Sequence, residues 1–322
     1  MTDLFSVNTN TNKITNVKDK EMISIYAKIE SVNVGQTSNQ SDYLNLQLMD
    51  ETGTILAKKW NITEEEKKQF KIGDIVHITG YGNEFNGKTQ IIIESIRVVD
   101  DSEGISLENF YKTAPLSKEE IRKNIIGFIN KIKNAKIQLI TKTLFEKYEE
   151  SYLTYPAATK NHHAYISGLG YHVLTMLKIG RSLCSIYPNV NEDLLYAGII
   201  LHDIGKVIEL SDYRDPEYTT IGKLIGHINI AFEIIGQTAK ELGIDGEEVM
   251  LLQHIILAHH GELEFGSPKR PQILEAELLH LIDLMDSRIN MILQELEETP
   301  EGDFSKRIYT LDGRVFYKHS LK

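Results

Sequence analysis

Residues 201–206 read LHDIGK, and they place a histidine beside an aspartate at the end of an apolar run. The preceding residues, YAGII at 196–200, have the character of a buried helix. Adjacent helical positions project about 100° apart, so His202 and Asp203 can both reach a crevice between this helix and its neighbours. Taken alone, such a pair is most often a polar patch at a helix end, so its meaning depends on the rest of the chain.

Similar polar residues interrupt other segments that should pack a core. They are His172 in GLGYHVLTML, His227 in GHINI, His259 and His260 in LAHHGE, and Asp283 in HLIDLMDSR. Each buried polar group without a partner costs about 1–3 kcal/mol, and a shared metal centre removes that cost. Imidazole and carboxylate ligands suit manganese, iron, cobalt, nickel or zinc, and they are too rich in nitrogen for calcium.

The composition narrows the class of protein. A chain of 322 residues suggests about two domains, and its one cysteine, Cys184, excludes an intrachain disulfide and a cysteine-based zinc cage. The polar N-terminus lacks the apolar stretch of a signal peptide, and no apolar run reaches the ~18 residues of a membrane helix. We therefore expect a cytoplasmic protein with no membrane partner. A net charge of −11 argues against a general nucleic-acid coat protein, so any contact with phosphates must be local.

The N-terminal part of the chain reads as β-structure. In YLNLQLMD (43–50) leucines alternate at 44, 46 and 48, which is the pattern of a half-buried strand. Further strands are expected at 54–60, 74–82 and 85–100, the last with an Asn86-Gly87 hairpin signal, and a short helix at 63–70. After a tail at residues 1–19, residues 20–100 are thus predicted to form a small β-barrel, with an OB-fold as the leading candidate.

The C-terminal part reads as helical. Residues 101–116 are interpreted as a linker, and Ser117 with Glu120 forms a capping box that starts the first helix. Residues 117–300 are predicted to form an all-α bundle, and residues 301–322 a tail or hairpin. The further helices are expected at 135–150, 162–186, 192–206, 223–242, 246–260 and 271–296.

The order of His172, His202-Asp203 and Asp283 resembles the HD-domain metal-dependent phosphohydrolase superfamily. By that resemblance the metal ligands would be His172, His202, Asp203, His227, His259, His260 and Asp283. Asp203 would bridge two divalent ions, and His227 with His259 or His260 would complete the second site. The resemblance favours Mn²⁺, and Mg²⁺, Co²⁺, Fe²⁺, Ni²⁺ or Zn²⁺ stay open.

A barrel followed by a linker and an HD domain is similar to the YhaM family of 3′→5′ exoribonucleases. The phrases that carry the resemblance are DETGTILAKKW, KNHHAYISGLGYH, LHDIGK and HHGELEFGSPKRP. It implies a hydrolase that shortens single-stranded RNA to nucleoside 5′-monophosphates, with single-stranded DNA and homo-oligomerisation left open. Catalysis would depend on Asp203 and Lys206.

Substrate contacts are predicted in both halves. In the helical half the candidates are His162, His163, Lys206, Lys269 and Arg270, each of which could instead be a solvated or locally bonded side chain. In the barrel they are Tyr43, Lys58, Tyr81 and Phe85, whose rings could stack on bases. For Trp60 we expect a core position. Asp286 and Arg288 are expected to form an ion pair with each other or with a neighbour, and His254 and His280 to be structural.

Two other functions remain compatible with the sequence. One keeps the metals but acts on small molecules, as a nucleotide phosphohydrolase or cyclic-nucleotide phosphodiesterase, although such a substrate needs no OB module. The other is a non-catalytic nucleic-acid-binding factor with the helical half as a scaffold, which the full ligand set disfavours.

Overall fold

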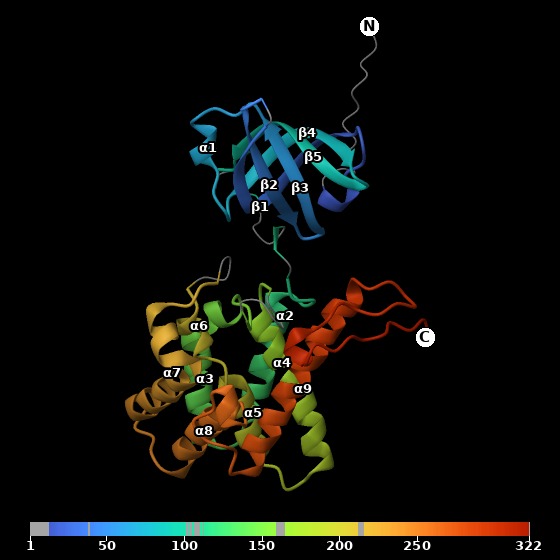
Figure 1. The fold of residues 1–322 in the computed structure, drawn as a ribbon. Coiled ribbons are helices and arrows are strands. Elements are labelled where there is room, and N and C mark those ends of the chain that lie inside the picture. The colour runs from blue at the N-terminus through green and yellow to red at the C-terminus, as the bar shows by residue number, and fades with distance from the viewer. Residues whose placement is uncertain are drawn as a thin grey trace. The chain divides into compact units, whose positions relative to one another are not determined.

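A computed structural model describes residues 13–37, 39–100, 103, 105, 110–111, 113–158, 165–211 and 216–321. The chain divides into two compact units, Met1–Thr113 and Ala114–Lys322. The first unit is a β-barrel and the second is helical, as the sequence predicts (Figure 1). Within the described residues, no helix combines the length and the apolar character needed to cross a membrane.

The five strands of the first unit close into a barrel in the order β1-β2-β3-β5-β4. Their bounds are β1 (Met22–Gln36), β2 (Asp42–Asp50), β3 (Gly53–Trp60), β4 (Ile75–Phe85) and β5 (Lys88–Val98). Neighbouring strands are antiparallel except β3 and β5, which pair in parallel and complete the barrel. The short helix α1 (Glu66–Gln69) lies between β3 and β4, and η1 (Ile14–Asn16) precedes β1.

Alternation of side chains explains the barrel. Leu44, Leu46 and Leu48 are fully buried in its interior, because every second residue of β2 faces inward. The β4–β5 hairpin turns at Asn86 and Gly87, whose φ angles of 53° and 73° are those of the tight turn that Asn-Gly favours. The hydrophobic pattern of the sequence therefore predicted this unit correctly.

Helices α2 to α9 build the second unit. Their bounds are α2 (Lys118–Ile129), α3 (Ala135–Tyr152), α4 (Gly168–Ile186), α5 (Glu192–Leu201), α6 (Lys206–Glu209), α7 (Thr220–Glu241), α8 (Glu247–Ala258) and α9 (Leu274–Glu297). The predicted capping box is confirmed, since Ser117 and Glu120 cap each other's backbone at the start of α2. Helix α5 is buried at nearly every position and packs against α3, α4, α8 and α9.

Two helix predictions were wrong in their bounds. The helix expected at 162–186 begins at Gly168, and the helix expected at 192–206 ends at Leu201, after which a turn leads to α6. Helix α7 also contains a kink at Gly226, whose φ of 77° lies outside the helical region. The end of α5 and the kink in α7 change the direction of the chain next to His202, Asp203 and His227, which were predicted to bind metal.

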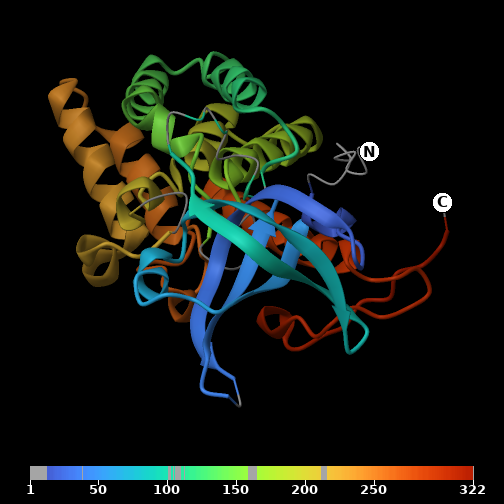
Figure 2. The same cartoon turned by 90° about the horizontal axis from the view of Figure 1, so that it is seen from above.

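The C-terminal residues fold back in a hairpin-like path beside α9, coloured red in Figures 1 and 2. Isolated antiparallel bridges join Phe304 to Tyr317 and Ile308 to Arg314. The short helix η5 (Tyr309–Leu311) is attached to α9, because the Thr310 hydroxyl lies 3.1 Å from Sδ of Met291 and Leu311 is buried. This segment forms one side of the site described next.

Candidate metal centre

Four side chains from α4, the end of α5 and α9 converge. His172 lies on α4, His202 and Asp203 directly follow α5, and Asp283 lies on α9. Nε2 of His172 is 3.3 Å from Oδ1 of Asp283 and 4.0 Å from Oδ2 of Asp203. Nε2 of His202 is 3.2 Å from the same Asp203 oxygen. The convergence arises because α4 and α9 both pack on α5 and on each other.

Backbone carbonyl groups fix the tautomers of two histidines. Nδ1 of His202 donates to the Ile199 carbonyl at 2.8 Å, and Nδ1 of His259 donates to the Ile256 carbonyl at 2.7 Å. Because a carbonyl oxygen only accepts, the proton of each neutral ring lies on Nδ1 and the lone pair on Nε2. Burial, followed by the neighbouring imidazoles, lowers the pKa of His259 well below its usual value. That ring is therefore neutral, as a metal ligand must be.

His227 enters the site through close backbone packing. It follows the kink at Gly226, and its carbonyl oxygen lies against Gly205, where an added Cβ would come within 2.1 Å of it. Glu209 accepts from both the backbone NH of His227, at 3.0 Å, and its Nδ1, at 3.1–3.2 Å. The Gly-Lys that follows the His-Asp pair thus has a structural reason: only glycine leaves room for the backbone of His227.

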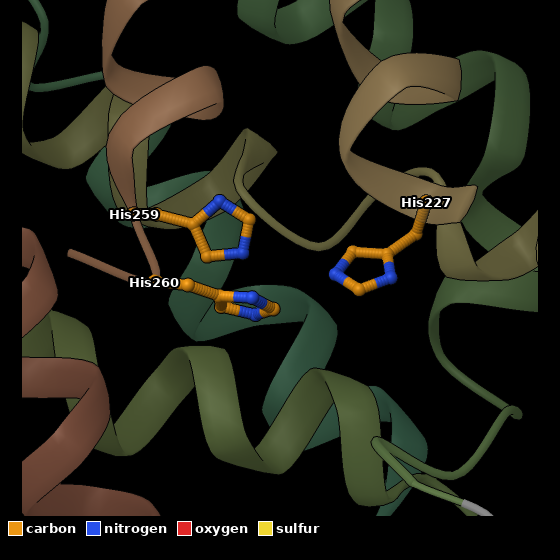
Figure 3. Close-up of side chains that lie close together, drawn as sticks. All are labelled: His227, His259 and His260. Carbon is orange, nitrogen blue, oxygen red and sulfur yellow. The ribbon is translucent and has the colours of Figure 1, made fainter. Parts of the chain in front are cut away.

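Three histidines form a group beside the first four residues. Figure 3 shows the rings of His227, His259 and His260 around a common space. One ligand atom from each of the three lies within 4.8 Å of the others, and the same holds for His172, His202 and Asp203. His259 and His260 directly follow α8, and the backbone NH of His260 donates to Ser267 Oγ at 3.0 Å.

Asp203 lies between the two groups. Its Oδ2 faces His202, while its Oδ1 is 3.6 Å from Nε2 of His227 and 3.9 Å from Nε2 of His259. Among the described residues, that Oδ1 and the Nε2 atoms of His202, His227 and His259 are buried and have no hydrogen-bond partner. These are all electron-pair donors directed into one space, an arrangement that is unfavourable unless cations lie there. The residues therefore fit a divalent-metal centre.

A second carboxylate, that of Asp286, contacts the ring nitrogen of His172 that does not face Asp283. Nδ1 of His172 lies 2.7 Å from Oδ2 of Asp286. Burial opposes protonation of this ring, but Asp283 and Asp286 outweigh it and raise the pKa of His172 to about 10. Asp286, which was expected to pair with Arg288 or with a neighbour, thus pairs with His172. Asp286 belongs to the carboxylate–histidine arrangement that orients metal ligands in proteins.

Lys206 lies at the edge of the centre. Its Nζ is 2.7 Å from Oδ2 of Asp203 and donates to the Ala157 carbonyl at 2.6 Å. Burial lowers the pKa of Lys206, but Asp203 overcomes this effect and the net shift is upward, so the side chain stays charged. The sequence analysis assigned Lys206 a substrate contact and a role in catalysis, but it did not foresee the ion pair with Asp203.

The other predicted substrate residues of this unit are exposed or lie outside the described residues. Arg270 is exposed and pairs with Glu262 at 2.7 Å, and Lys269 is exposed in the same loop. His162 and His163 lie outside the described residues. The expected structural roles of two histidines agree with the contacts: Nε2 of His254 accepts from the Gln272 NH at 3.0 Å, and Nδ1 of His280 lies 3.1 Å from the His259 carbonyl oxygen.

In the barrel unit, four side chains gather on the outer face of β2, β3 and β4, and we call them the aromatic platform: Tyr43, Lys58, Trp60 and Phe85. The rings of Tyr43 and Trp60 are 4.8 Å apart, and Nζ of Lys58 lies 5.6–5.8 Å from the centres of all three rings. The expectation that Trp60 lies in the core was wrong, since it is 39% exposed. Tyr81 is half-buried elsewhere on β4, opposite Met22 and Ile92.

The reason for the error at Trp60 is its register. Trp60 on β3 pairs directly with Tyr43 on β2. Both residues occupy outward-facing positions, since the leucines of β2 and Ala57 of β3 alternate with them and point into the barrel. The strand alternation TILAKKW could have indicated this, because Ala57 and Ile55 share the face opposite to Lys58 and Trp60. Tryptophan as a residue type favours burial, but the alternation of the strand places Trp60 on the outer face.

Comparisons with known proteins agree with this architecture. The family model described as "HD domain" matches residues 169–288, and that described as "OB-fold nucleic acid binding domain" matches residues 23–99. The chain is 46% identical over 298 residues to a protein of Geobacillus sp. (strain WCH70) named 3′-5′ exoribonuclease YhaM, covering 92% of each chain.

Two other relatives carry the same name. The protein of Halalkalibacterium halodurans is 48% identical, with 92% of this chain and 93% of that protein covered. The protein of Listeria monocytogenes serovar 1/2a is 45% identical, with 94% and 96% covered. With both domains matched and nearly the whole length aligned at this identity, the chain belongs to the YhaM family of 3′-5′ exoribonucleases.

Proposed function

We propose that this protein is a divalent-metal-dependent exoribonuclease that removes nucleotides from the 3′ end of single-stranded RNA and releases nucleoside 5′-monophosphates. The observation that carries the proposal is the position of Asp203 between two groups of imidazoles, with its Oδ1 and three Nε2 atoms lacking partners among the described residues. The proposed 3′→5′ direction and the choice of RNA as substrate rest on the names of the relatives given above.

We assign the ligands to two ions that share Asp203. One ion would be held by His172, His202 and Asp283, and the other by His227, His259 and His260, each together with Asp203. The two oxygens of Asp203 face these two groups separately, which supports a bridging role. Nitrogen and oxygen ligands accept Mn²⁺, which we favour, as well as Mg²⁺, Co²⁺, Fe²⁺, Ni²⁺ or Zn²⁺.

The reaction is the hydrolysis of the last phosphodiester linkage. The oxygen of water bonds to phosphorus and the bond from phosphorus to the 3′ oxygen of the penultimate nucleotide breaks. That 3′ oxygen takes up a proton, and the released nucleotide keeps the phosphate on its 5′ carbon. Bound divalent ions supply a water of lowered pKa and neutralise charge on the phosphate.

The protein's own groups hold this site in one geometry. Carbonyl groups fix the His202 and His259 rings, and Glu209 and Asp286 hold those of His227 and His172, so no ring must reorient when substrate binds. Lys206 remains charged beside Asp203 and is a protein cation within reach of a phosphate at the proposed ligands. These preorganised groups are what the reaction requires of the fold.

The barrel would hold the single strand upstream. In the aromatic platform, Tyr43, Trp60 and Phe85 offer faces to bases, and Lys58 among them offers a charge to the backbone. Because the whole chain carries a net charge of −11, this contact is local, and with one lysine it should depend on stacking more than on salt.

The test is an assay of the purified full chain with Mn²⁺ and single-stranded RNA labelled at its 5′ end. We expect a ladder that shortens from the 3′ end and mononucleotides that co-migrate with 5′-phosphate standards. Asp203→Ala and His227→Ala should abolish shortening, whereas His319→Ala, at an exposed position outside the site, should act like the wild type. Single-stranded DNA in parallel defines the sugar preference.

Other outcomes would favour the remaining hypotheses. Intact RNA with hydrolysed mononucleotides or cyclic nucleotides would indicate a small-molecule phosphohydrolase. If the wild type turns over neither RNA nor nucleotides, and its metal content does not change in Asp203→Ala and His202→Ala, only a nucleic-acid-binding factor would remain.

A further inference from the structure

A cleft of about 400 Å³ extends from the metal ligands along α9. At one end it is lined by Asp203 and Asp283, and at the other by Met291 and the segment Thr310, Leu311 and Asp312. Its volume lies in the range of clefts that hold small ligands. The cleft therefore offers room next to the proposed reaction site for part of a nucleic-acid chain.

One face of α9 forms the floor of this cleft. Asp283, Ser287 and Met291 follow each other at intervals of four residues, and Leu284 with Arg288 form the adjacent row. A helix rises 1.5 Å per residue, so this face runs about 12 Å from the ligand Asp283 to Met291. The helix that provides a metal ligand thus continues as a surface of mixed apolar and polar character.

Arg288 is the cation of this surface that is available to a ligand. It is exposed, lines the cleft and makes no hydrogen bond or ion pair with the described part of the chain. By contrast, Lys206 is bound to Asp203 and Ala157, and Arg270 is paired with Glu262 outside the cleft. A guanidinium group suits bidentate binding of a phosphate.

The C-terminal segment forms the opposite wall. It lies beyond the HD-domain match, which ends at residue 288, yet Thr310, Leu311 and Asp312 line the cleft. The contact of Thr310 with Met291 and the burial of Leu311 attach it to the helical unit. The negative charge of Asp312 on this wall disfavours a phosphate there and leaves α9 as the side that a phosphate would face.

Provided that the proposed function holds, we infer that this cleft binds the retained RNA chain directly upstream of the scissile linkage, and that Arg288 binds the phosphate of the second linkage from the 3′ end. The released nucleotide ends in a 3′-hydroxyl and carries no further phosphate. An unpaired guanidinium group beyond the metal ligands can therefore meet a second phosphate only on the RNA chain that is retained after cleavage. Leu284, Met291 and Leu311 provide apolar surface for the base or sugar between the two phosphates.

The experiment removes the charge of one phosphate at a time. A 5′-labelled RNA carries a neutral methylphosphonate either at the second linkage or at the sixth linkage from the 3′ end, or at neither. The ribose on the 5′ side of each of these two linkages is 2′-deoxy in all three substrates, so that the linkages are stable and the sugars match. The removal of the first nucleotide, through a natural terminal linkage, gives kcat/KM for wild type, Arg288→Gln and the exposed control Arg181→Gln.

For the wild type we expect a neutral second linkage to slow this step on the order of ten- to a hundred-fold, the effect of a lost charged hydrogen bond, and a neutral sixth linkage to have little effect. Arg288→Gln should lose the same factor on the natural substrate and lose no more when the second linkage is neutral. Arg181→Gln should behave as the wild type on all three substrates.

Three results would overturn the inference: no effect of the second linkage in the wild type, equal effects of both linkages, or a loss in Arg288→Gln that is the same with charged and neutral linkages. The last would indicate a structural role only, which the melting temperature of the variant checks independently. Failure of the wild type to shorten unmodified RNA would instead refute the proposed function.

Discussion

Oδ2 of Asp286 lies 2.7 Å from Nδ1 of His172, while Nε2 of the same ring lies 3.3 Å from Oδ1 of Asp283. One imidazole thus connects two carboxylates of the same helix, three residues apart. The inner carboxylate is suited to ligate a cation, and the outer one orients the ring and increases its basicity.

Replacing the outer carboxylate should weaken metal binding without removing a ligand. For Asp286→Asn we expect a 10- to 100-fold lower affinity for Mn²⁺, about the usual effect of losing such a partner. Competition with a chelator measures it, and Asp245→Asn, an exposed carboxylate outside the site, is the matched control. An affinity unchanged from wild type would show that Asp286 has only a packing role.

Metal affinity should depend on pH through His172. In the metal-free protein burial disfavours the charged ring, but Asp283 and Asp286 prevail and raise its pKa to about 10. A cation at Nε2 must displace that proton, so affinity should rise about tenfold per pH unit below the pKa and level off above it. His259, whose pKa is lowered, is already neutral and should release none.

Calorimetry in two buffers of different ionisation enthalpy tests this expectation. At pH 7 the binding of Mn²⁺ should release at least about one proton. Binding without proton release, and with an affinity that is constant between pH 6 and 8, would contradict the assignment of His172 as a protonated ligand in the metal-free protein.

Gly205 should not tolerate a side chain. In Gly205→Ala the new Cβ would lie 2.1 Å from the His227 carbonyl oxygen, so the backbone must shift, at a cost of about 1–3 kcal/mol. The shift also moves His227, which we propose as a metal ligand, so both the stability of the helical unit and its metal content should fall.

The control is Gly127→Ala in α2, where an added Cβ meets nothing within 4 Å. There we expect a gain of about 0.5–1 kcal/mol from helix propensity. Urea denaturation of both variants gives the comparison, and equal stabilities would show that the contact between Gly205 and His227 is not tight.

The aromatic platform predicts an optical signal. Trp60 is the only tryptophan of the chain and is partly exposed, so stacking of a base should change its fluorescence when single-stranded RNA binds. Trp60→Ala should weaken binding by about 1–3 kcal/mol, and Ile72→Ala, another exposed apolar residue of the barrel unit, should not. Unchanged fluorescence at saturating RNA would exclude Trp60 from the binding face.

Local pattern was sufficient for the elements and for the ligand types. The alternation of Leu44, Leu46 and Leu48 predicted a strand of the barrel, and Ser117 with Glu120 predicted the start of a helix, because both signals depend on neighbours a few residues away. Histidines and aspartates within apolar segments indicated a metal centre, because burial without a partner would be unfavourable for each of them.

Three features could not be read from the chain. Asp286 was expected to pair with Arg288 or with a neighbour, but the sequence did not identify that neighbour as His172, 114 residues away. It likewise did not show that Glu209 supports His227. The C-terminal segment was interpreted as a tail or hairpin, and its contribution to the cleft was not foreseen.

By itself, therefore, the sequence determined most of the elements and most of the buried positions, and it indicated that several buried polar residues share a divalent-metal site. Only the tertiary structure decided the partner of each polar side chain, because that depends on how α4, α5 and α9 cross and on which turn of each helix faces the next. A difference of two positions on α9 is about half a turn, enough to direct Asp286 into the core and Arg288 into the cleft.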